Sequence, residues 1–213
     1  MKKLIVIGAG DFGREVTWIV ERINAQSPAW DLLGFVDDSA AVRGSVVDGY
    51  PVLGSVAYLD TITEETYVVC SIGTGRVRKK VMERVLKNPH FHPASLIDPT
   101  VVIGRNACVE DGCVVCAGTV LAISSHLSAH TIVNLNCTIG HDTVLGPYCT
   151  VHPGSNLSGK VRVGSCTDIG TGTKIIQGLT VCPNCTLGAG AVVVRDLTEP
   201  GTYVGIPARK VHG

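Results

Sequence analysis

The 213-residue chain is predicted to fold as an α/β domain with a parallel sheet, followed by a left-handed parallel β-helix. Residues 1–96 alternate short apolar runs with helical patterns, and residues 97–193 repeat an aliphatic position every six residues. The first segment carries 22 of the 36 charges and the second only nine. A change this sharp divides the chain into two folding units. We place them at residues 1–90 and 91–213, because three prolines within 89–99 stop any helix across the junction.

The first unit is expected to begin with a strand, a glycine-rich loop and a helix. Residues 4–7 are a short apolar run, and the apolar residues of 14–23 fall on one helical face. Further strands are expected over 32–36 and 67–72, and a second helix over 76–87. The residues that this second helix is expected to turn inward are Val77, Val81, Val85 and Leu86. Because strands that alternate with helices pair in parallel, a parallel sheet is predicted.

The loop after the first strand reads GAGDFG at residues 8–13, and Asp37 ends the second strand. The spacing fits the dinucleotide-binding fingerprint, in which bare backbone amides and a helix N-terminus attract phosphate. A turn used only for tight packing would need the same glycines, so this alternative stays open. Residues 1–96 supply only half of a full Rossmann sheet, with no second half for a nicotinamide. A single nucleotide diphosphate therefore fits this unit better.

The second unit is predicted from a repeat of six residues. Seventeen consecutive positions at this spacing are aliphatic. They are Ile97, Ile103, Val109, Val115, Leu121, Leu127, Val133, Ile139, Leu145, Val151, Leu157, Val163, Ile169, Ile175, Val181, Leu187 and Val193. A period of six matches neither a helix nor an open strand, but it keeps one face buried in a triangular coil with three six-residue sides. This repeat is typical of the left-handed parallel β-helix.

The position four residues after each aliphatic residue from Ile97 to Leu187 is small in thirteen of sixteen cases, and we expect it to point inward at a corner. The cysteines at this position are Cys113, Cys137, Cys149 and Cys185. Cysteine acts there as a compact apolar filler. Each of the two C-x-x-C pairs has one member inside and one outside, which disfavours the alternative of a zinc ribbon. Nine cysteines without a secretion signal are expected to be free thiols.

His141 and Asp142 are the candidate chemical groups of the repeat. Histidine, with an ordinary pKa of about 6.5, suits a base at neutral pH, and an adjacent carboxylate can orient its ring. Asn134 lies seven residues earlier, about one side of the coil away. A zinc enzyme similar to the γ-class carbonic anhydrase would need a pair of histidines five residues apart, and the chain has none, so we expect no metal. An axial ion held by symmetry-related His126 or His130 stays open as an alternative.

Composition excludes several classes of protein. Lysine plus arginine and aspartate plus glutamate number 18 each, so the chain has no cationic excess for nucleic acid or an anionic membrane surface. Hydrophobic residues make up 45% of the chain, which favours a sizeable core over disorder. No apolar run reaches the roughly 18 residues of a membrane span, and the first run stops at Gly8, too early for a signal peptide. We therefore expect a cytoplasmic protein.

A half-Rossmann unit followed by an uninterrupted hexapeptide repeat resembles the sugar acyltransferases of the NeuD and PglD type over the whole chain. The matching segments are residues 5–13, 34–38, 71–73 with 78–80, 134–159 and 204–209. This family includes O-acetyltransferases of sialic acid and N-acetyltransferases that act on nucleotide-linked amino sugars. The resemblance implies an acetyl-CoA-dependent enzyme that forms a homotrimer, with acetyl-CoA lying between neighbouring coils.

The resemblance also implies roles for individual residues. His141 would be the general base, together with Asp142 and Asn134, and the backbone amide of Gly159 would bind the thioester carbonyl. The residues expected to bind the nucleotide-linked sugar are Gly8, Gly10, Asp11, Phe12, Gly13, Asp37, Asp38 and Gly73. The residues expected to bind acetyl-CoA are Gly159, Thr171, Ala189, Pro207, Arg209 and Lys210.

The expected reaction is a direct transfer to an acceptor amine, without a metal or a covalent intermediate. Acylation of Cys137 or Cys149 is the weaker alternative, because both are expected inside the coil. Some family members carry a second histidine nine residues after the base, where this chain has Thr150, and a contribution of Thr150 or His152 stays open. O-acetylation of a sialic acid or related sugar and a non-catalytic role in binding nucleotide sugars are the alternative functions.

Overall fold

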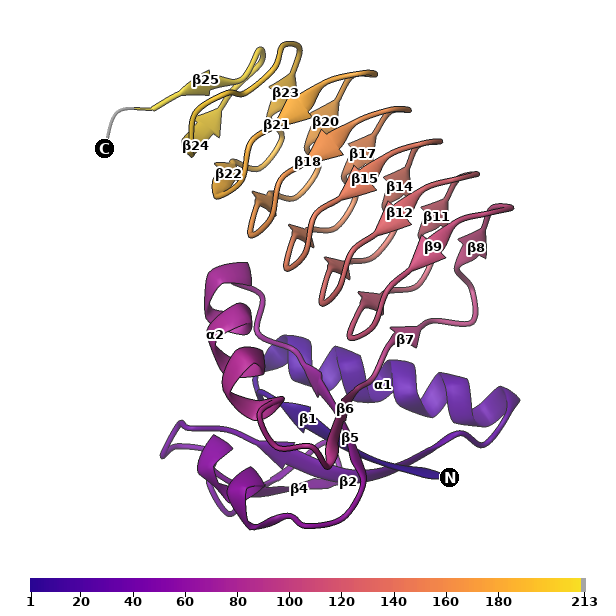
Figure 1. Ribbon diagram of the computed structural model, residues 1–213, viewed down its shortest axis with the longest axis vertical. Coiled ribbons are helices and arrows are strands. Elements are labelled where there is room, and N and C mark those ends of the chain that lie inside the picture. The colour runs from indigo at the N-terminus through magenta and orange to yellow at the C-terminus, as the bar shows by residue number, and fades with distance from the viewer. Residues whose placement is uncertain (212–213) are drawn as a thin grey trace.

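The computed structural model describes residues 1–211 and shows two units joined end to side (Figure 1). The first unit contains a six-stranded sheet in the order β3-β4-β2-β1-β5-β6. Its strands are β1 (Lys2–Ile7), β2 (Trp30–Val36), β3 (Val46–Val47), β4 (Tyr50–Gly54), β5 (Thr66–Cys70) and β6 (Phe91–Pro93). Only β3 and β4 pair antiparallel, so the predicted parallel sheet is confirmed. Because β6 still belongs to this sheet, the second unit begins after Pro93 rather than at residue 91.

Helix α1 (Asp11–Gln26) lies between the sheet and the second unit (Figure 1). Val16 and Val20 of α1 share one core with Leu4 of β1 and with Leu96 and Ile132 of the second unit. The apolar face predicted for this helix therefore packs against both the sheet of the first unit and the second unit. As a result, the two units are held together by a continuous hydrophobic core rather than by a free linker.

Helix α2 (Gly75–Val85) and the 3₁₀ helix η1 (Val56–Thr61) cover the other face of the sheet. The buried residues of α2 are Gly75, Arg78, Met82 and Val85. Val77, in contrast, is 45% exposed. The prediction that Val77 faces the core was wrong, because Arg78 and Met82 occupy the buried face. The helix is therefore rotated by about one residue relative to the prediction.

The second unit is a left-handed parallel β-helix, a prism with three flat sides, which confirms the fold predicted from the repeat. Side 1 contains β7 (Leu96–Ile97), β10 (Val114–Val115), β13 (Ile132–Val133), β16 (Thr150–Val151), β19 (Asp168–Ile169), β22 (Cys185–Leu187), β24 (Gly201–Val204) and the antiparallel β25 (Arg209–Lys210). Side 2 contains β8 (Val102–Ile103), β11 (Val120–Leu121), β14 (Thr138–Ile139), β17 (Asn156–Leu157), β20 (Lys174–Ile175) and β23 (Val192–Val193). Side 3 contains β9 (Cys108–Val109), β12 (His126–Leu127), β15 (Val144–Leu145), β18 (Arg162–Val163) and β21 (Thr180–Val181).

The aliphatic residues of the repeat fill the prism. From Val115 onward every one of them is buried. Ile103 departs from the prediction and is 50% exposed. It lies on β8, the first strand of side 2, so no coil covers it from below.

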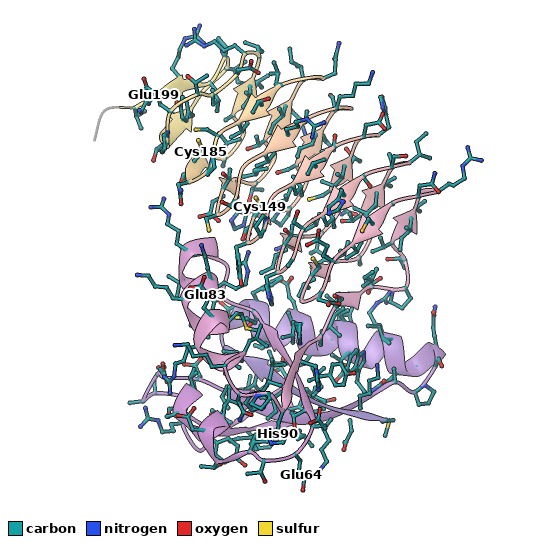
Figure 2. All side chains as sticks on the ribbon, in the orientation of Figure 1. Glu64, Glu83, His90, Cys149, Cys185 and Glu199 are labelled. Carbon is teal, nitrogen blue, oxygen red and sulfur yellow. The ribbon has the colours of Figure 1, made fainter. Side chains whose placement is uncertain are left out.

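The small residues at the corners also point inward, and most of their polar atoms form a regular ladder, although the buried hydroxyl of Ser125 has no partner among the described residues. Thr119 donates to the carbonyl of Asn134 at 2.9 Å, and Thr143 donates to the carbonyl of Ser158 at 2.8 Å. The Cys149 thiol occupies the same place and is shown inside the prism in Figure 2. A buried hydroxyl or thiol satisfies a backbone carbonyl here, which explains why the position favours Thr, Ser and Cys as well as Ala.

A second regularity of the prism was not predicted. Every sixth residue from Asn106 to Gly190 has a φ between 54° and 76°, in the left-handed region. These residues form the corners, where glycine, asparagine and aspartate are the least strained. His130, Asp142 and Tyr148 hold such positions, and the first two of these matter for the chemistry and stability described below.

All nine cysteines are free, as predicted. Within residues 1–211, no group of three or more His, Cys, Asp or Glu side chains is arranged to hold a metal ion. In the same range, no helix has both the length and the apolar character needed to cross a membrane.

Candidate active site

His141 and Asp142 form a hydrogen-bonded pair at the corner between sides 2 and 3. His141 follows β14, and its Nδ1 lies 2.8 Å from Oδ2 of Asp142. The left-handed conformation of Asp142, with φ at 58°, turns the carboxylate back toward the preceding ring. The two side chains are 55% and 51% exposed, so a reactant can approach them. If Nδ1 donates its proton to Asp142, Nε2 carries the lone pair that a general base needs.

Gly159 lies directly against the free edge of the His141 ring. A β-carbon at Gly159 would come within 2.3 Å of Nε2, so only glycine leaves room for the imidazole. Among the described residues, no group accepts the N–H of Gly159. A base and an unpaired backbone donor therefore meet at one spot, which is the arrangement required to deprotonate a nucleophile and hold a developing oxyanion.

Asn134 is not brought to this pair. It follows β13 on side 1, and its Oδ1 accepts a hydrogen bond from the backbone N–H of Leu135 at 2.7 Å. Seven residues of chain turn one corner and run along side 2 before they reach His141, so the side chain of Asn134 stays on another side. Within one chain the two residues therefore lie about one side of the coil apart, as their spacing indicates, and a catalytic role of Asn134 stays a prediction.

Thr150 and His152 also lie on side 1. Thr150 is buried and donates to the carbonyl of Gly73 at 2.6 Å, so its hydroxyl serves the contact between the two units. His152 is half-buried and lies near Asp168, whose pKa is raised by burial. The alternative nucleophiles Cys137 and Cys149 are fully buried, and burial raises the pKa of both thiols, that of Cys149 to about 12. Neither thiol is suited to carry an acyl group.

A pocket of about 300 Å³ opens at the carboxyl ends of β1 and β2. It is lined by Ile7, Gly8, Val36, Asp37, Asp38, Val56, Ile72, Val77 and Val81. Val77, which sequence placed in the core, is exposed because it forms part of this wall. The apolar residues contributed by η1 and α2 could not be found from the glycine pattern, since they are distant in sequence.

The acidic pair predicted for this pocket is also part of its frame. Asp37 accepts hydrogen bonds from the backbone N–H groups of Ala9 at 2.8 Å and Ser39 at 2.7 Å. Asp38 accepts from the N–H of Val56 at 2.9 Å. Asp37 thereby fixes the glycine-rich loop, so its carboxylate positions the loop as well as facing the pocket.

The glycines of the loop have different roles. A β-carbon on Gly13 would lie 2.2 Å from the carbonyl oxygen of Gly8, so Gly13 is needed for close packing. A β-carbon on Gly10 would meet no atom within 4 Å, and α1 begins at the next residue, Asp11. Phe12 is half-buried and packs against the core under α1, and Gly73 lies in the loop before α2. Packing alone therefore explains Gly13 but not Gly10.

Three of the residues expected to bind acetyl-CoA lie along two edges of side 2. Gly159 is at the corner between sides 2 and 3, and the exposed Thr171 and Ala189 are at the corner between sides 1 and 2. The other three lie near the end of the chain: Pro207 is in the turn that follows β24, and Arg209 and Lys210 form β25 of side 1, where Lys210 bonds Glu199 at 2.9 Å. One chain thus places Gly159 and the pair Thr171 and Ala189 at opposite edges of a flat side.

The two halves of the candidate site also lie far apart within one chain. Helix α1 packs against side 1 through the hydrophobic core that the two share, and α2 contacts the corner between sides 3 and 1. His141 is at the remaining corner, opposite side 1. The width of the prism therefore separates the base from the pocket of its own chain.

Comparison with known proteins gives a consistent result. A family model described as the PglD N-terminal domain matches residues 3–85. The acetyltransferase domain of PglB from Neisseria gonorrhoeae is 33% identical, with a TM-score of 0.90 over 99% of this chain and 100% of that chain. The same domain has been solved in complex with acetyl coenzyme A.

Two further relatives match most of the chain. PerB from Caulobacter crescentus, solved with CoA and GDP-perosamine, is 27% identical, with a TM-score of 0.89 over 100% of this chain and 98% of that chain. GDP-perosamine N-acetyltransferase from Escherichia coli O157:H7 is 28% identical over 187 residues, which cover 87% of this chain and 82% of the relative. The predictions of an acyltransferase and of acetyl-CoA as its co-substrate are confirmed. The chain belongs to the NeuD/PglD-type family of sugar acetyltransferases.

Proposed function

We propose that the protein transfers the acetyl group of acetyl-CoA to the amine of a nucleotide-linked amino sugar. The observation that carries this proposal is the close approach of Nε2 of His141 to Gly159, whose N–H has no acceptor within residues 1–211. The pocket beside Gly8 and Asp37 offers a place for the nucleotide. The relatives that act on or bind GDP-perosamine support an amino sugar as the acceptor.

In the proposed mechanism, Nε2 of His141 takes the proton of the acceptor amine as its nitrogen attacks the thioester carbon. Asp142 keeps the ring in place and stabilises the imidazolium that forms. The N–H of Gly159 donates to the oxyanion of the tetrahedral intermediate, a fixed dipole that does not reorganise during the reaction. When the intermediate collapses, the C–S bond breaks, the thiolate of CoA leaves and a proton completes CoA-SH.

A homotrimer is part of the proposal, because one chain separates the two halves of the site. The nucleotide pocket of one copy would face His141 of a neighbour, and the coenzyme would lie between two prisms. Side 2 and its edges expose apolar side chains suited to burial between copies. These are Val102, Val120, Ile123, Ile176 and Val194. Nine free thiols fit the reducing cytoplasm as the place where the enzyme works.

The test is a CoA-release assay with three kinds of acceptor: UDP-linked amino sugars, GDP-perosamine and CMP-linked sialic acid. We expect turnover with a nucleotide-linked amino sugar and a product that carries a new amide. Turnover with the sialic acid alone would replace N-acetylation by O-acetylation. Binding of nucleotide sugars without CoA release from any of them would contradict an enzymatic role.

A further inference from the structure

Arg78 is a buried arginine at the contact between the two units. It lies on α2, its side chain is 1% exposed, and six acceptors surround its guanidinium group. Nη1 donates to the carbonyl oxygens of Ile72 at 2.5 Å and Gly73 at 2.9 Å, in the loop that precedes α2. The other four acceptors belong to the prism.

The prism acceptors come from two successive coils. Nε donates to the carbonyl of His130 at 2.9 Å. Nη2 donates to the carbonyls of Tyr148 and Cys149 and to the hydroxyl of Thr150, each at 3.0 Å. None of these acceptors is a carboxylate, and burial lowers the pKa of Arg78. A buried cation without an ionic partner is an unfavourable way to gain stability alone.

The shape of the arginine side chain explains its place. A planar guanidinium presents five N–H donors in a fixed fork, so it can bond two structural units at once. A lysine ammonium has three donors around one nitrogen and cannot span the same acceptors. The contact therefore requires this side chain for its geometry rather than for its charge.

The loop that Arg78 holds leads directly to the glycine-rich loop. Thr150 donates to the carbonyl of Gly73, and the Ser71 hydroxyl lies 3.0 Å from the carbonyl oxygens of both Ile7 and Gly8. A β-carbon on Gly75 would lie 2.1 Å from the carbonyl oxygen of Tyr148, so the backbone already touches the prism there. The prism is thus linked to Gly8 by hydrogen bonds at Gly73 and Ser71 and by the short backbone segment between these two residues.

We propose that Arg78 is a positioning residue for acyl transfer. It fixes the loop beside the proposed nucleotide pocket relative to the prism of its own chain. Because the prisms pack against one another in the proposed trimer, it also fixes where the acceptor amine stands relative to the base of the neighbouring copy. Arg78 does not contact the substrate in this arrangement. The inference rests on the proposed function, because it concerns the same transfer reaction. A displacement of about 1 Å far from the reacting atoms can cost roughly 100-fold in rate.

A second contact between the two units provides a matched control. Arg22 of α1 donates from Nε and Nη2 to the carboxylate of Asp98, at 2.6 and 3.2 Å. The side chain of Asp98 is fully buried. This ion pair crosses the same boundary as Arg78, yet it touches neither residues 71–75 nor the glycine-rich loop.

The experiment compares Arg78→Lys with Arg22→Lys, two variants that keep the charge and lose the fork. For each, kcat and the KM of both substrates are measured, together with Tm and amide hydrogen exchange over residues 8–13 and 71–75. Arg78→Lys is expected to lower kcat by roughly 10- to 100-fold, to leave the KM of acetyl-CoA within about twofold, and to speed exchange in both loops. Arg22→Lys is expected to lower Tm while kcat stays within about twofold of the parent value.

A further variant keeps the test decisive if lysine is poorly accommodated. Arg78→Ala is assayed with and without millimolar guanidinium ion, which should refill the cavity and raise kcat, whereas ammonium ion should not. Two results would overturn the positioning role. One is an unchanged kcat in Arg78→Lys, and the other is a loss of kcat in both lysine variants in proportion to their loss of Tm. Should the parent protein turn over no nucleotide-linked amino sugar, the proposed function fails. Hydrogen exchange in the two loops then still decides whether Arg78 holds them.

Discussion

At the scale of single residues, the proposed chemistry depends on one left-handed corner. Asp142 holds a φ of 58°, and this conformation brings its carboxylate to the ring of the residue before it. Aspartate is one of the few side chains that tolerate the left-handed region, because its short polar group can bond locally. The corner thus forms the pair, and Gly159 one coil later leaves space for the ring.

The first prediction concerns the base. His141→Ala is expected to lower kcat by about 10² to 10⁴, the usual contribution of a general base, while acetyl-CoA still binds. Asp142→Asn should lose less, because the base itself remains. Steady-state kinetics at saturating acetyl-CoA checks this, with His152→Ala as the control. Loss of turnover in His152→Ala with activity retained in His141→Ala would move the base to side 1.

The second prediction concerns Gly159. In Gly159→Ala, the new β-carbon would occupy the space of Nε2, so the ring must leave its place over the amide. We expect a loss of kcat of about 10² or more, comparable to losing one oxyanion donor. Ser158→Ala, at the exposed neighbouring position, is the matched control and should keep its rate. Equal rates in the two variants would exclude the contact between His141 and Gly159 from the mechanism.

At the scale of elements, the glycine-rich loop contains two kinds of glycine: some are needed for packing, and others are free to face a ligand. Gly10→Val is expected to fold, because a β-carbon at Gly10 meets no atom within 4 Å. The added side chain should block the approach of phosphate to the N-terminus of α1. The KM of the sugar nucleotide should rise while that of acetyl-CoA stays constant. An equal rise of both KM values would show that the loop serves packing only.

The corner that faces α2 is expected to make stability depend on pH. Burial, and then the charge of Arg78, lowers the pKa of His130, whose ring stacks on Tyr148 at 4.8 Å. In the unfolded chain the imidazole of His130 has its ordinary pKa of about 6.5, so the unfolded chain binds a proton there more readily than the folded protein does. The contribution of neutral His130 to the free energy of unfolding is therefore complete above that pH and is lost as the pH falls below it.

Thermal unfolding between pH 7.5 and 5.5 tests this effect of His130. Tm of the parent should decline over this range, and His130→Asn should show a smaller decline, since asparagine accepts the left-handed φ of 58° without titrating. The exposed histidines paired with Glu65 and Glu110 remain in both proteins, so they cancel in the comparison. Identical pH slopes for the two proteins would contradict a buried, neutral His130.

Elements with a simple period were predictable from the sequence, and contacts between elements were not. The six-residue repeat predicted the prism because each coil contacts only its neighbours, so local spacing determines the packing. The buried face of α2 was misplaced because Arg78 is buried by acceptors more than 50 residues away. The separation of Asn134 and His141 by about one side of the coil followed from the repeat, but spacing along one chain does not say which residues of a neighbouring copy approach either of them.

At the scale of the whole molecule, the arrangement of the two units bears on which copies would react in the proposed trimer. The proposed nucleotide pocket belongs to the unit that covers side 1, whereas His141 is at the opposite corner of the same prism. A heterologous contact repeated around a threefold axis would bring the base of one copy to the pocket of the next. Transfer between copies is therefore the central claim about how this enzyme works.

Mixing two defective variants tests that claim most directly. His141→Ala lacks the base, and in Gly10→Val the added side chain blocks the approach of phosphate to the loop. The two variants are co-expressed, purified, confirmed as trimers by light scattering and assayed at limiting sugar nucleotide. If base and loop come from different copies, about a quarter of the sites in a random mixture combine two intact parts, and activity returns well above that of either variant alone. If both parts come from one chain, every site carries a lesion, and activity that stays at the level of the separate variants would contradict the account.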